Sequence, residues 1–214
     1  MSLVTLNGAR VQALTLHMPR VGLWHGVAIV DSRAAVAPRV TLTAPELSLV
    51  GANIVGSSFL DSQCVRLVAG AGGLRATLPA RGYRSPTVRL ILQDLARESG
   101  ETLSTTIAPA VLARTLPFWT RAQGSGGQSL ATLATALGVS WRVLDDGSIW
   151  VGTLPTVEVV GAYQVIDERP HDRWFMTASS APFIRPGSSI RGRAVREVSH
   201  TFEGDRVRSE VFYE

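Results

Sequence analysis

Few residues of this chain have the types and spacing that catalysis or metal binding requires. The four histidines are His17, His25, His171 and His200, and none stands at the spacing of a metal-ligand pair. A zinc site needs about four ligands, so we expect neither a metal nor a cofactor. His171-Asp172 could form a catalytic dyad, but a solvated pair in a loop is the simpler interpretation.

Carboxylates and glycines offer the remaining chemistry. Glu46 and Glu98 could supply the two carboxylates of a glycan hydrolase, although nothing else in the sequence supports that role. Asp145-Asp146-Gly147 is typical of a turn. A phosphate-binding loop needs a helix directly after its glycines. Residues 74–79 instead favour a strand, so we predict a hairpin turn at 70–73.

The basic residues are all arginine. There are 21 of them against 17 acidic residues, which gives a net charge of +4. Nine fall within residues 1–93, where only three acidic residues occur. A basic portion could face nucleic acid, but the arginines are scattered and no row of aromatic residues interleaves them. A nucleic-acid-binding β-barrel module is therefore one alternative function, and a hydrolase acting on cell-wall glycan is another.

Other features bear on the cellular location. Cys64 is the single cysteine, and a buried, reduced thiol is its expected state. The first residues lack the basic and apolar regions of a signal peptide. No apolar run reaches the roughly 18 residues of a membrane-spanning helix. We therefore predict a protein without a membrane anchor, made in a reducing cytoplasm.

The first part of the chain has the pattern of a β-rich fold. With 20 Gly and 11 Pro, many turns are expected. Short β-compatible runs follow each other closely, as in barrels and sandwiches. The predicted strands are 10–17, 22–30, 39–43, 46–51, 53–56, 63–68 and 74–78.

Helical patterns begin at Ser85. This residue is the predicted N-cap of a helix that ends at Gly100, with Pro86 at its first position. Residues 109–116 predict a second, short helix.

The segment 127–152 is the clearest local unit. Ser129 is the predicted N-cap of a helix over 130–137, and Gly138 its left-handed C-terminal residue. A β-hairpin follows at 139–144 and 148–152.

After Pro155 the pattern returns to strands. The region 167–182 is irregular and aromatic, and 203–205 predicts the turn of a terminal hairpin. The predicted strands are 156–165, 189–200 and 206–213.

Tryptophan and arginine dominate the hot spots of protein interfaces, although core packing is the usual role of tryptophan. Trp119 and Trp174 lie in less regular segments. The predicted partner-interface residues are Trp119, Arg121, Trp174, Arg191 and Arg193.

The order of elements along the chain is distinctive. An N-terminal β region ends in the Gly-Gly turn, and a Ser-Pro-capped helix, a linker and the unit 127–152 follow. The chain closes with Pro186-Gly187-Ser188-Ser189-Ile190 and the hairpin 195–211. This order resembles baseplate hub proteins of contractile-tailed, Mu-like phages and related contractile injection systems.

The resemblance implies a mechanical role without catalytic residues, so the chain is not expected to be an enzyme. Such hubs form a ring, usually a homotrimer, that adapts the six-fold tail tube to the central spike. The implied partners are further copies of the chain, the tail tube protein, the central spike protein and other baseplate proteins, with nucleic acid only as passing cargo. The implied location is the baseplate of the virion, after assembly in the bacterial host cytoplasm.

The expected fold class is α+β and β-rich, with tube-like β-barrel lobes and an inserted small α/β lobe. The expected division is a β-barrel lobe 1–83, an inserted lobe 84–152 of helices plus a β-hairpin, and a second β lobe 153–214 that completes the tube-like ring.

Overall fold

The computed structural model of the chain describes residues 4–159, 163–179, 184–190, 192–204 and 206–214. It contains two compact units, Met1–Ala69 with Pro155–Glu214, and Gly70–Leu154. Within the described part of the chain, no helix is long and apolar enough to span a membrane.

Six strands of the first unit close into a β-barrel. They follow each other in the order β1-β4-β5-β6-β3-β2, and β1 also pairs with β2, which completes the circle. Side chains alternate between inside and outside, so that Leu14, Val65 and Leu67 are buried. The strands are β1 Thr5–Leu6, β2 Ala9–Pro19, β3 His25–Val30, β4 Arg39–Ala44, β5 Leu47–Phe59 and β6 Ser62–Ala69.

The other six strands of this unit form a sheet in the order β13-β16-β17-β18-β15-β14. Its core contains Phe175, Val198 and Val211, with Ile184 and Ile190 packed in the same cluster. The elements are β13 Val157–Glu158, β14 Gln164–Arg169, the 3₁₀ turn η2 Pro170–Asp172, β15 Trp174–Ser179, β16 Ser188–Ile190, β17 Arg193–Glu203 and β18 Arg206–Tyr213.

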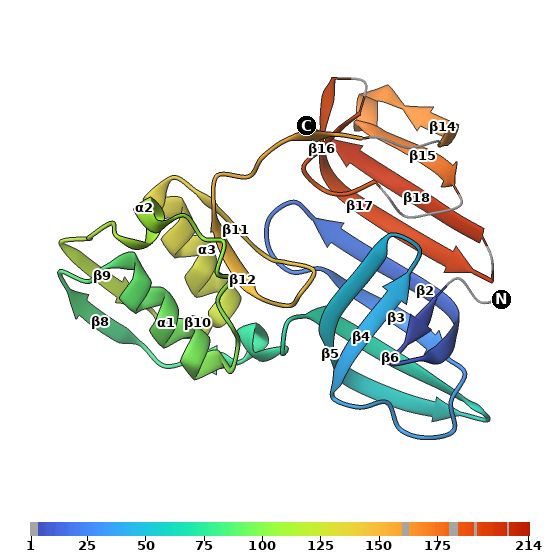
Figure 1. Ribbon diagram of the computed structural model, residues 1–214, viewed down its shortest axis with the longest axis horizontal. Helices are drawn as coiled ribbons and strands as arrows, with labels where there is room; N and C mark the ends of the chain where they lie inside the picture. Colours follow the sequence, from blue (N-terminus) through green and yellow to red (C-terminus); the bar gives the residue numbers. More distant parts are fainter. Residues whose placement is uncertain (1–3, 160–162, 180–183, 191, 205) are drawn as a thin grey trace. The chain divides into compact units, whose positions relative to one another are not determined.

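Strand β2 joins the barrel to the second sheet. Along one edge it pairs with β3. Along the other edge, its first two residues pair with β1, and Ala13–Pro19 pair with β17. As a result, all twelve strands belong to one continuous sheet (Figure 1).

The two groups of six strands share one order of strand neighbours, with one difference in direction, since β1–β4 is antiparallel and β13–β16 is parallel. We call β1–β6 the first set and β13–β18 the second set, and match them in chain order. The pairings β1–β4, β4–β5, β5–β6, β6–β3 and β3–β2 recur as β13–β16, β16–β17, β17–β18, β18–β15 and β15–β14. Among the described residues, the closing pair β1–β2 has no counterpart between β13 and β14. The first unit is therefore a structural duplication with one closed and one open copy.

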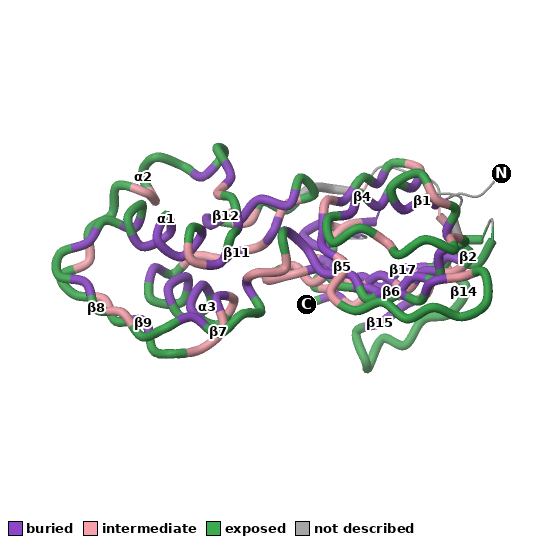
Figure 2. The backbone as a smooth tube through the Cα atoms, turned by 90° about the horizontal axis from the view of Figure 1, so that it is seen from below, coloured by how far each residue is buried: buried purple, intermediate pink, exposed green. Residues whose placement is uncertain are grey.

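The unit Gly70–Leu154 packs helices α1 and α3 against short two-stranded sheets. Leu92 and Leu95 of α1 and all three leucines of α3 are buried, and both helices carry purple segments in Figure 2. The strand pairs are β7–β10, β8–β9 and the hairpin β11–β12. The elements are η1 Gly73–Arg75, β7 Thr77–Leu78, β8 Arg81–Arg84, α1 Val88–Ser99, α2 Pro109–Leu112, β9 Phe118–Arg121, β10 Gly124–Ser125, α3 Gly126–Leu137, β11 Ser140–Val143 and β12 Ile149–Gly152.

The predicted fold class is confirmed, since the chain is β-rich α+β with a closed β-barrel. The three-part division at 83 and 152 stays a prediction. The hairpin predicted at the end of the segment 127–152 is confirmed as β11 and β12.

Helix α1 ends where the sequence predicts but begins elsewhere. Gly100 caps it in the left-handed conformation, at φ 68°. Its N-cap is Thr87, whose hydroxyl accepts the Leu90 N–H at 3.2 Å. Ser85 was the wrong choice because its own φ of 46° places it in the turn before the helix.

Helix α3 shows the same shift at its N-terminus. Gly138 ends it as predicted, at φ 66°. Its N-cap is Ser125 and not Ser129, because the Ser125 hydroxyl accepts the Gln128 N–H at 3.1 Å. The short helix α2 stops at Leu112 instead of 116, since the following residues turn back to pair with the segment before α1.

Several strand boundaries were predicted wrongly. The strands 46–51 and 53–56 are one strand, β5, which continues through a β-bulge beyond Asn53. The region 167–182 is regular over 167–179, which hold the end of β14, the turn η2 and all of β15, and 180–182 lie outside the described residues. The single strand 189–200 is two strands separated at Gly192, which has a φ of 75°. In the segment 156–165, only 157–158 and 164–165 are strand, and 160–162 lie outside the described residues.

The glycine-rich segment 70–73 is not a hairpin turn. It leads into the 3₁₀ turn η1, and β7 pairs with β10 instead of β6. The loop wraps around the Glu101 carboxylate, which accepts the Ala71 N–H at 2.7 Å and the Gly73 N–H at 2.8 Å. The backbone N–H groups of Ala71 and Gly73 are therefore satisfied by a side chain and not by a neighbouring strand.

Candidate assembly surface

Eight strands of the first unit form one antiparallel face. The first set contributes β5, β6, β3 and β2, and the second set contributes β17, β18, β15 and β14, in this spatial order. Every neighbouring pair is antiparallel. Directions alternate across an even number of strands, so the outermost strands β5 and β14 run in opposite directions.

Both ends of this eight-stranded face are free edges. Strand β5 pairs with β4 only up to Ala52. Within the described chain, Ile54–Phe59 on the side away from β6 and the outer side of β14 have no partner strand. Free edges present unpaired backbone N–H and C=O groups, which can pair with another chain.

Large hydrophobic side chains are exposed at both edges. On the β5 side, Val55 is 55% exposed, Phe59 74% and Leu60 87%. On the β14 side, Ile166 is 52% exposed at a β-bulge. Exposed apolar residues that gather along an edge mark an interaction surface more often than isolated ones do.

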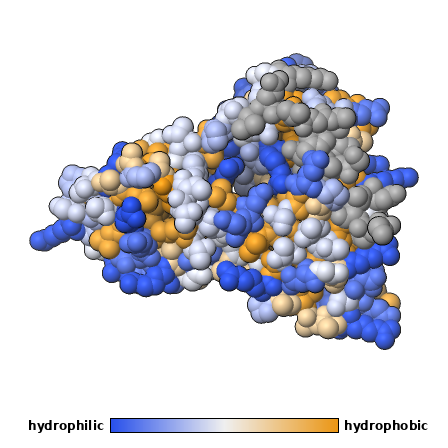
Figure 3. Space-filling view, viewed as in Figure 1, coloured by the Kyte–Doolittle hydropathy of each residue, from blue (hydrophilic) through white to orange (hydrophobic). Residues whose placement is uncertain are grey.

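The outer side of the eight-stranded face changes character between the two sets. In the first set few outward positions are charged. Val27, Ile29 and Val55 are exposed there, and Arg10 and Arg66 are the charged side chains among the described outward residues of β2, β3, β6 and Ile54–Phe59. In the second set charges dominate. They are Asp167, Arg169, Glu203, Arg206, Arg208 and Glu210. On the side shown in Figure 3, apolar and hydrophilic residues alternate at the surface of this unit.

The two sets turn between their last strands with loops of the same length. Phe59 pairs with Ser62, and Glu203 pairs with Arg206, so each turn has two residues. The first turn residue is left-handed in both, Gly204 at φ 63° and Leu60 at φ 52°. A leucine in this conformation carries steric strain that glycine does not. This strained backbone carries an apolar side chain that is 87% exposed.

A row of polar residues crosses the interior of the second set. His200, Ser209 and Thr177 are neighbours in register on β17, β18 and β15, and all three are buried. His200 Nδ1 lies 2.8 Å from Ser209 Oγ. The matching positions of the barrel are apolar, with Val65 in place of Ser209 and Ala28 in place of Thr177.

Burial of the His200 imidazole sets its protonation. Burial lowers the pKa of His200 to about 3, the positive charge of Arg185 adds to this, and the backbone of Ile184 opposes it. His200 is therefore neutral at physiological pH and serves the packing of the second set rather than acid–base chemistry.

Comparison with known proteins gives a result for structure and none for sequence. No family model and no curated protein matches the sequence. The tail protein of prophage MuSo2 from Shewanella oneidensis is 7% identical, with a TM-score of 0.67 over 100% of this chain and 97% of that one. The tail protein from Neisseria meningitidis MC58 is 11% identical, with a TM-score of 0.66 over 99% of this chain and 96% of that one. The chain has the phage tail-protein fold.

The same fold extends to a secretion system. The c3393 protein of Escherichia coli, a component of the type VI secretion system described as similar to the T4 tail proteins gp27 and gp5, is 13% identical, with a TM-score of 0.64 over 99% of this chain and 76% of that one. The resemblance found in the sequence is thus confirmed, because the structural neighbours of this chain are tail proteins and their secretion-system relatives.

Two of the predicted interface residues lie in the second set of this tail-protein fold. Trp174 is on β15, next to the free edge strand, and the Arg169 guanidinium lies 5.1 Å from the centre of its ring. Arg193 is exposed on β17, 4.5 Å from the centre of the Tyr213 ring and 3.6 Å from the Glu168 carboxylate. Arg191 lies outside the described residues.

The other two predicted interface residues are neighbours on β9 of the unit Gly70–Leu154. Trp119 is half-buried opposite Tyr83, whereas the Arg121 guanidinium is buried. The interface role of these residues stays a prediction. The free edges and the tip at Leu60 were not predicted, because Leu60-Asp61 has none of the glycine or asparagine that marks a two-residue hairpin turn.

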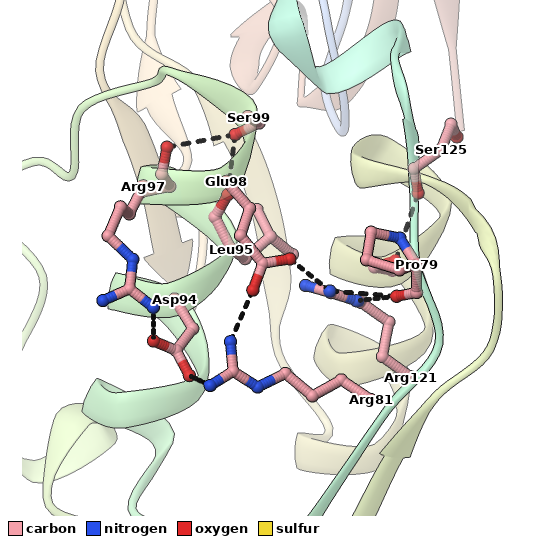
Figure 4. Close-up of polar contacts among 11 residues, drawn as sticks. Pro79, Arg81, Asp94, Leu95, Arg97, Glu98, Ser99, Arg121 and Ser125 are labelled. Carbon is pink, nitrogen blue, oxygen red and sulfur yellow. Dashed lines mark hydrogen bonds and ion pairs between the residues drawn. The ribbon is translucent and has the colours of Figure 1, made fainter.

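Arg121 belongs to a cluster of ion pairs that joins helix α1 to the strand pair β8–β9 (Figure 4). Arg81 bridges Asp94 and Glu98, and Arg121 contacts Glu98 and the carbonyl oxygen of Pro79. Burial alone would raise the pKa of Glu98, but hydrogen bonds from Arg121 and Arg81 hold it below its usual range. The Glu98 carboxylate is therefore ionised and occupied by structural partners.

The remaining candidate groups are placed as follows. His17 and His25 stack across β2 and β3 with their ring centres 5.1 Å apart. His171-Asp172 lies exposed in η2, and Glu46 lies exposed in the turn between β4 and β5. The described residues contain no group of three or more metal-ligating side chains.

Cys64 is exposed, which corrects the expectation of a buried thiol. Its neighbours Gln63 and Val65 point into the barrel, so the alternation of the strand places Cys64 outside.

Proposed function

We propose that this chain is a structural baseplate hub protein of a phage tail or a related contractile injection system, without catalytic activity. Identical copies join into a ring, a trimer, that adapts the six-fold tail tube to the central spike. The proposed partners are therefore further copies of the chain, the tail tube protein, the central spike protein and other baseplate proteins. It acts in the tail baseplate of the virion after assembly in the host cytoplasm.

One observation carries the proposal. The eight-stranded face holds two copies of the same strand arrangement side by side, and it ends in two free edges that run in opposite directions. Opposite directions allow the β14 edge of one copy to meet the β5 edge of the next as an antiparallel pair. Head-to-tail interfaces of this kind generate closed rings. Three copies would present six strand sets around the axis, which is the symmetry that a six-fold tube requires.

The ring has a definite expected size. With strands about 4.8 Å apart, three eight-stranded faces would line a ring roughly 40 Å across at the backbone. The structural neighbours support an assembly role, since they are tail proteins, a type VI secretion component and a PdpA–VgrG complex of Francisella. That Francisella chain is only about half covered by this one, at 49%, so it is compared in fold alone.

Light scattering on a sizing column, followed by electron microscopy of the main species, tests the proposal. We expect the mass of three chains and ring-shaped particles. A chain that stays monomeric at every concentration and never joins a tail would contradict the proposal. A filter-binding assay across salt concentrations separates the nucleic-acid alternative, because phosphate contacts give a steep salt dependence.

A further inference from the structure

Inside one chain, the first set meets the second set where Ala13–Pro19 of β2 pair with Glu197–Glu203 of β17, and we call this pairing the seam. Its geometry serves as the model for the contact between chains. In a ring of repeated sets, each first set also meets the second set of a neighbouring copy. The strands that correspond to β2 and β17 at that meeting are β14 and β5, the two free edges.

The duplication defines which residues correspond on the β5 side. Both terminal hairpins have two-residue turns, after Phe59 and after Glu203. Ser57 and Thr201 each lie two residues before the last pair of their hairpin. Ser57 of the first set therefore corresponds to Thr201 of the second set.

The same counting applies on the β14 side. Along the barrel, Thr15 pairs with Val27, which pairs with Arg66, the fourth residue after the start of β6. Along the second set, Asp167 pairs with Met176, which pairs with Glu210, the fourth residue after the start of β18. Asp167 therefore corresponds to Thr15.

Inside the chain, Thr15 pairs with Thr201. This pair is not hydrogen-bonded, because the bonds that cross the seam run from Gly204 N to Gln12 O and from Arg20 N to Arg196 O, one position out of phase with it. Side chains of such pairs stand closest together. The corresponding pair between copies is Asp167 with Ser57.

We propose that the ring closes by antiparallel pairing of β14 with β5 of the next copy, with Asp167 opposite Ser57 and the Phe59–Leu60 tip as its apolar anchor. This proposal rests on the proposed ring and adds its seam and register. The bulge at Ile166 adds one residue to β14, so Gln164 corresponds to Ala13, the partner of Glu203, and Phe59 stands opposite Gln164. Pairing covers the apolar side chains exposed along both edges, Val55, Phe59 and Leu60 on one and Ile166 on the other. A two-fold pairing of β14 with itself would leave the Phe59–Leu60 tip uncovered.

Disulfide crosslinking tests the register in the full-length chain. Ser57→Cys and Asp167→Cys are combined on a Cys64→Ser background, because the native thiol is exposed. Oxidation is expected to give covalent species of up to three chains on a denaturing gel, which reductant reverses. The positive control is Thr15→Cys with Thr201→Cys, which places the same geometry inside one chain.

Two further controls fix the direction and the register. Either single substitution alone is expected to stay uncrosslinked, whereas a two-fold seam would crosslink through Asp167→Cys alone. Ser57→Cys with Arg169→Cys shifts the register by two residues and is expected to fail. Efficient crosslinking of this shifted pair, or of a single variant, would overturn the proposal.

The failure of the seam is distinguishable from the failure of the proposed function. If light scattering shows a trimer but the Ser57–Asp167 pair does not crosslink, the proposed pairing of β14 with β5 is wrong and the proposed hub function is unaffected. If the chain is monomeric, the proposed pairing and the proposed function are both contradicted.

A second variant does not depend on new cysteines. Phe59→Ser is expected to raise the concentration needed for trimer formation at least tenfold. Phe118→Ser is the matched control, because Phe118 is 64% exposed but lies in the unit Gly70–Leu154, which contributes no strand to the proposed pairing. Unchanged association of Phe59→Ser would count against the apolar anchor.

Discussion

The two strand sets of the first unit have the same strand order and different contents. The barrel set is closed, is apolar inside apart from Gln63, and turns through a strained leucine; the second set is open, holds a polar row inside, and turns through a glycine. What the sets share is the alternation of inward and outward residues and the short hairpin turn. These features are enough to specify strand order, since pairing register follows from turn length and from the buried face. The chemistry of each face is then free to differ.

Closure explains why the difference matters. In the barrel, β1 pairs with β2 and leaves no edge between them, whereas β14 stays free on its outer side within the described chain. The open set presents the outer side of its edge strand β14 to a partner, whereas the closed set leaves only Ile54–Phe59 of β5 free. The second set is therefore the half of the duplication that we expect to respond most strongly to changes in its interior and its surroundings.

The largest expected difference between the sets is their response to acid. The pKa of His200 is about 3 in the folded chain, against 6.5 in the unfolded chain. As pH falls below about 6.5 the unfolded chain takes up this proton first, so the contribution of His200 to stability is complete above pH 6.5 and declines until about pH 3. The expected loss is on the order of 5 kcal/mol. Hydrogen exchange is expected to locate the loss in β17 and β18.

The control for the acid response is His200→Gln, which keeps polar atoms and removes the titration. Its free energy of unfolding is expected to change much less between pH 6.5 and 4 than that of the parent chain. Equal slopes for the two proteins would mean that another group causes the response.

The polar row can be tested by exchanging the corresponding residues Val65 and Ser209. Val65→Ser puts an unpaired hydroxyl into the apolar barrel and is expected to cost about 3 kcal/mol of unfolding free energy. Ser209→Val removes the hydrogen bond to His200 and leaves a buried imidazole nitrogen unpaired, which costs about 1–3 kcal/mol. Denaturant unfolding of each variant measures these losses. A neutral effect of both would mean that the two interiors are interchangeable.

Local structure was predictable from the sequence where a single residue controls it. Gly100 and Gly138 end their helices because only a residue without Cβ adopts the left-handed conformation easily, and the hairpin β11–β12 follows from its Asp-Asp-Gly turn. The helix N-caps were not predictable, because serine and threonine occur at several neighbouring positions. The choice of Thr87 and Ser125 depends on how the preceding residues turn.

The duplication and the free edges could not be predicted, because corresponding residues are chemically unlike. Val65 corresponds to Ser209, and Thr15 to Asp167, so no sequence repeat indicates the match. Only pairing across the sheet defines it. The fold class came from the spacing of turns, whereas the assembly surface depends on which strand ends up at an edge, and strand order is a non-local property.

The smallest expected difference lies in the two turns, where stability and assembly should respond in opposite directions. Leu60→Asn relieves the left-handed strain and is expected to stabilise the isolated chain by about 1 kcal/mol, since asparagine tolerates this conformation. Gly204→Leu introduces the same strain at the corresponding position and is expected to cost about 1–2 kcal/mol. Denaturant unfolding of monomeric samples measures both changes.

Light scattering on the same two variants gives the second half of the comparison. If Leu60 is retained for contact with the next copy, Leu60→Asn weakens the trimer even though it stabilises the monomer. Gly204 lies at the seam within the chain, where its N–H already donates to Gln12 O, so Gly204→Leu is expected to destabilise the monomer without strengthening the ring. A Leu60→Asn chain that is both more stable and equally well assembled would show that the leucine has no role at the edge. The left-handed strain at the exposed Leu60 would then have no function. The difference between leucine in one turn and glycine in the other would reflect only the divergence of the duplicated sets.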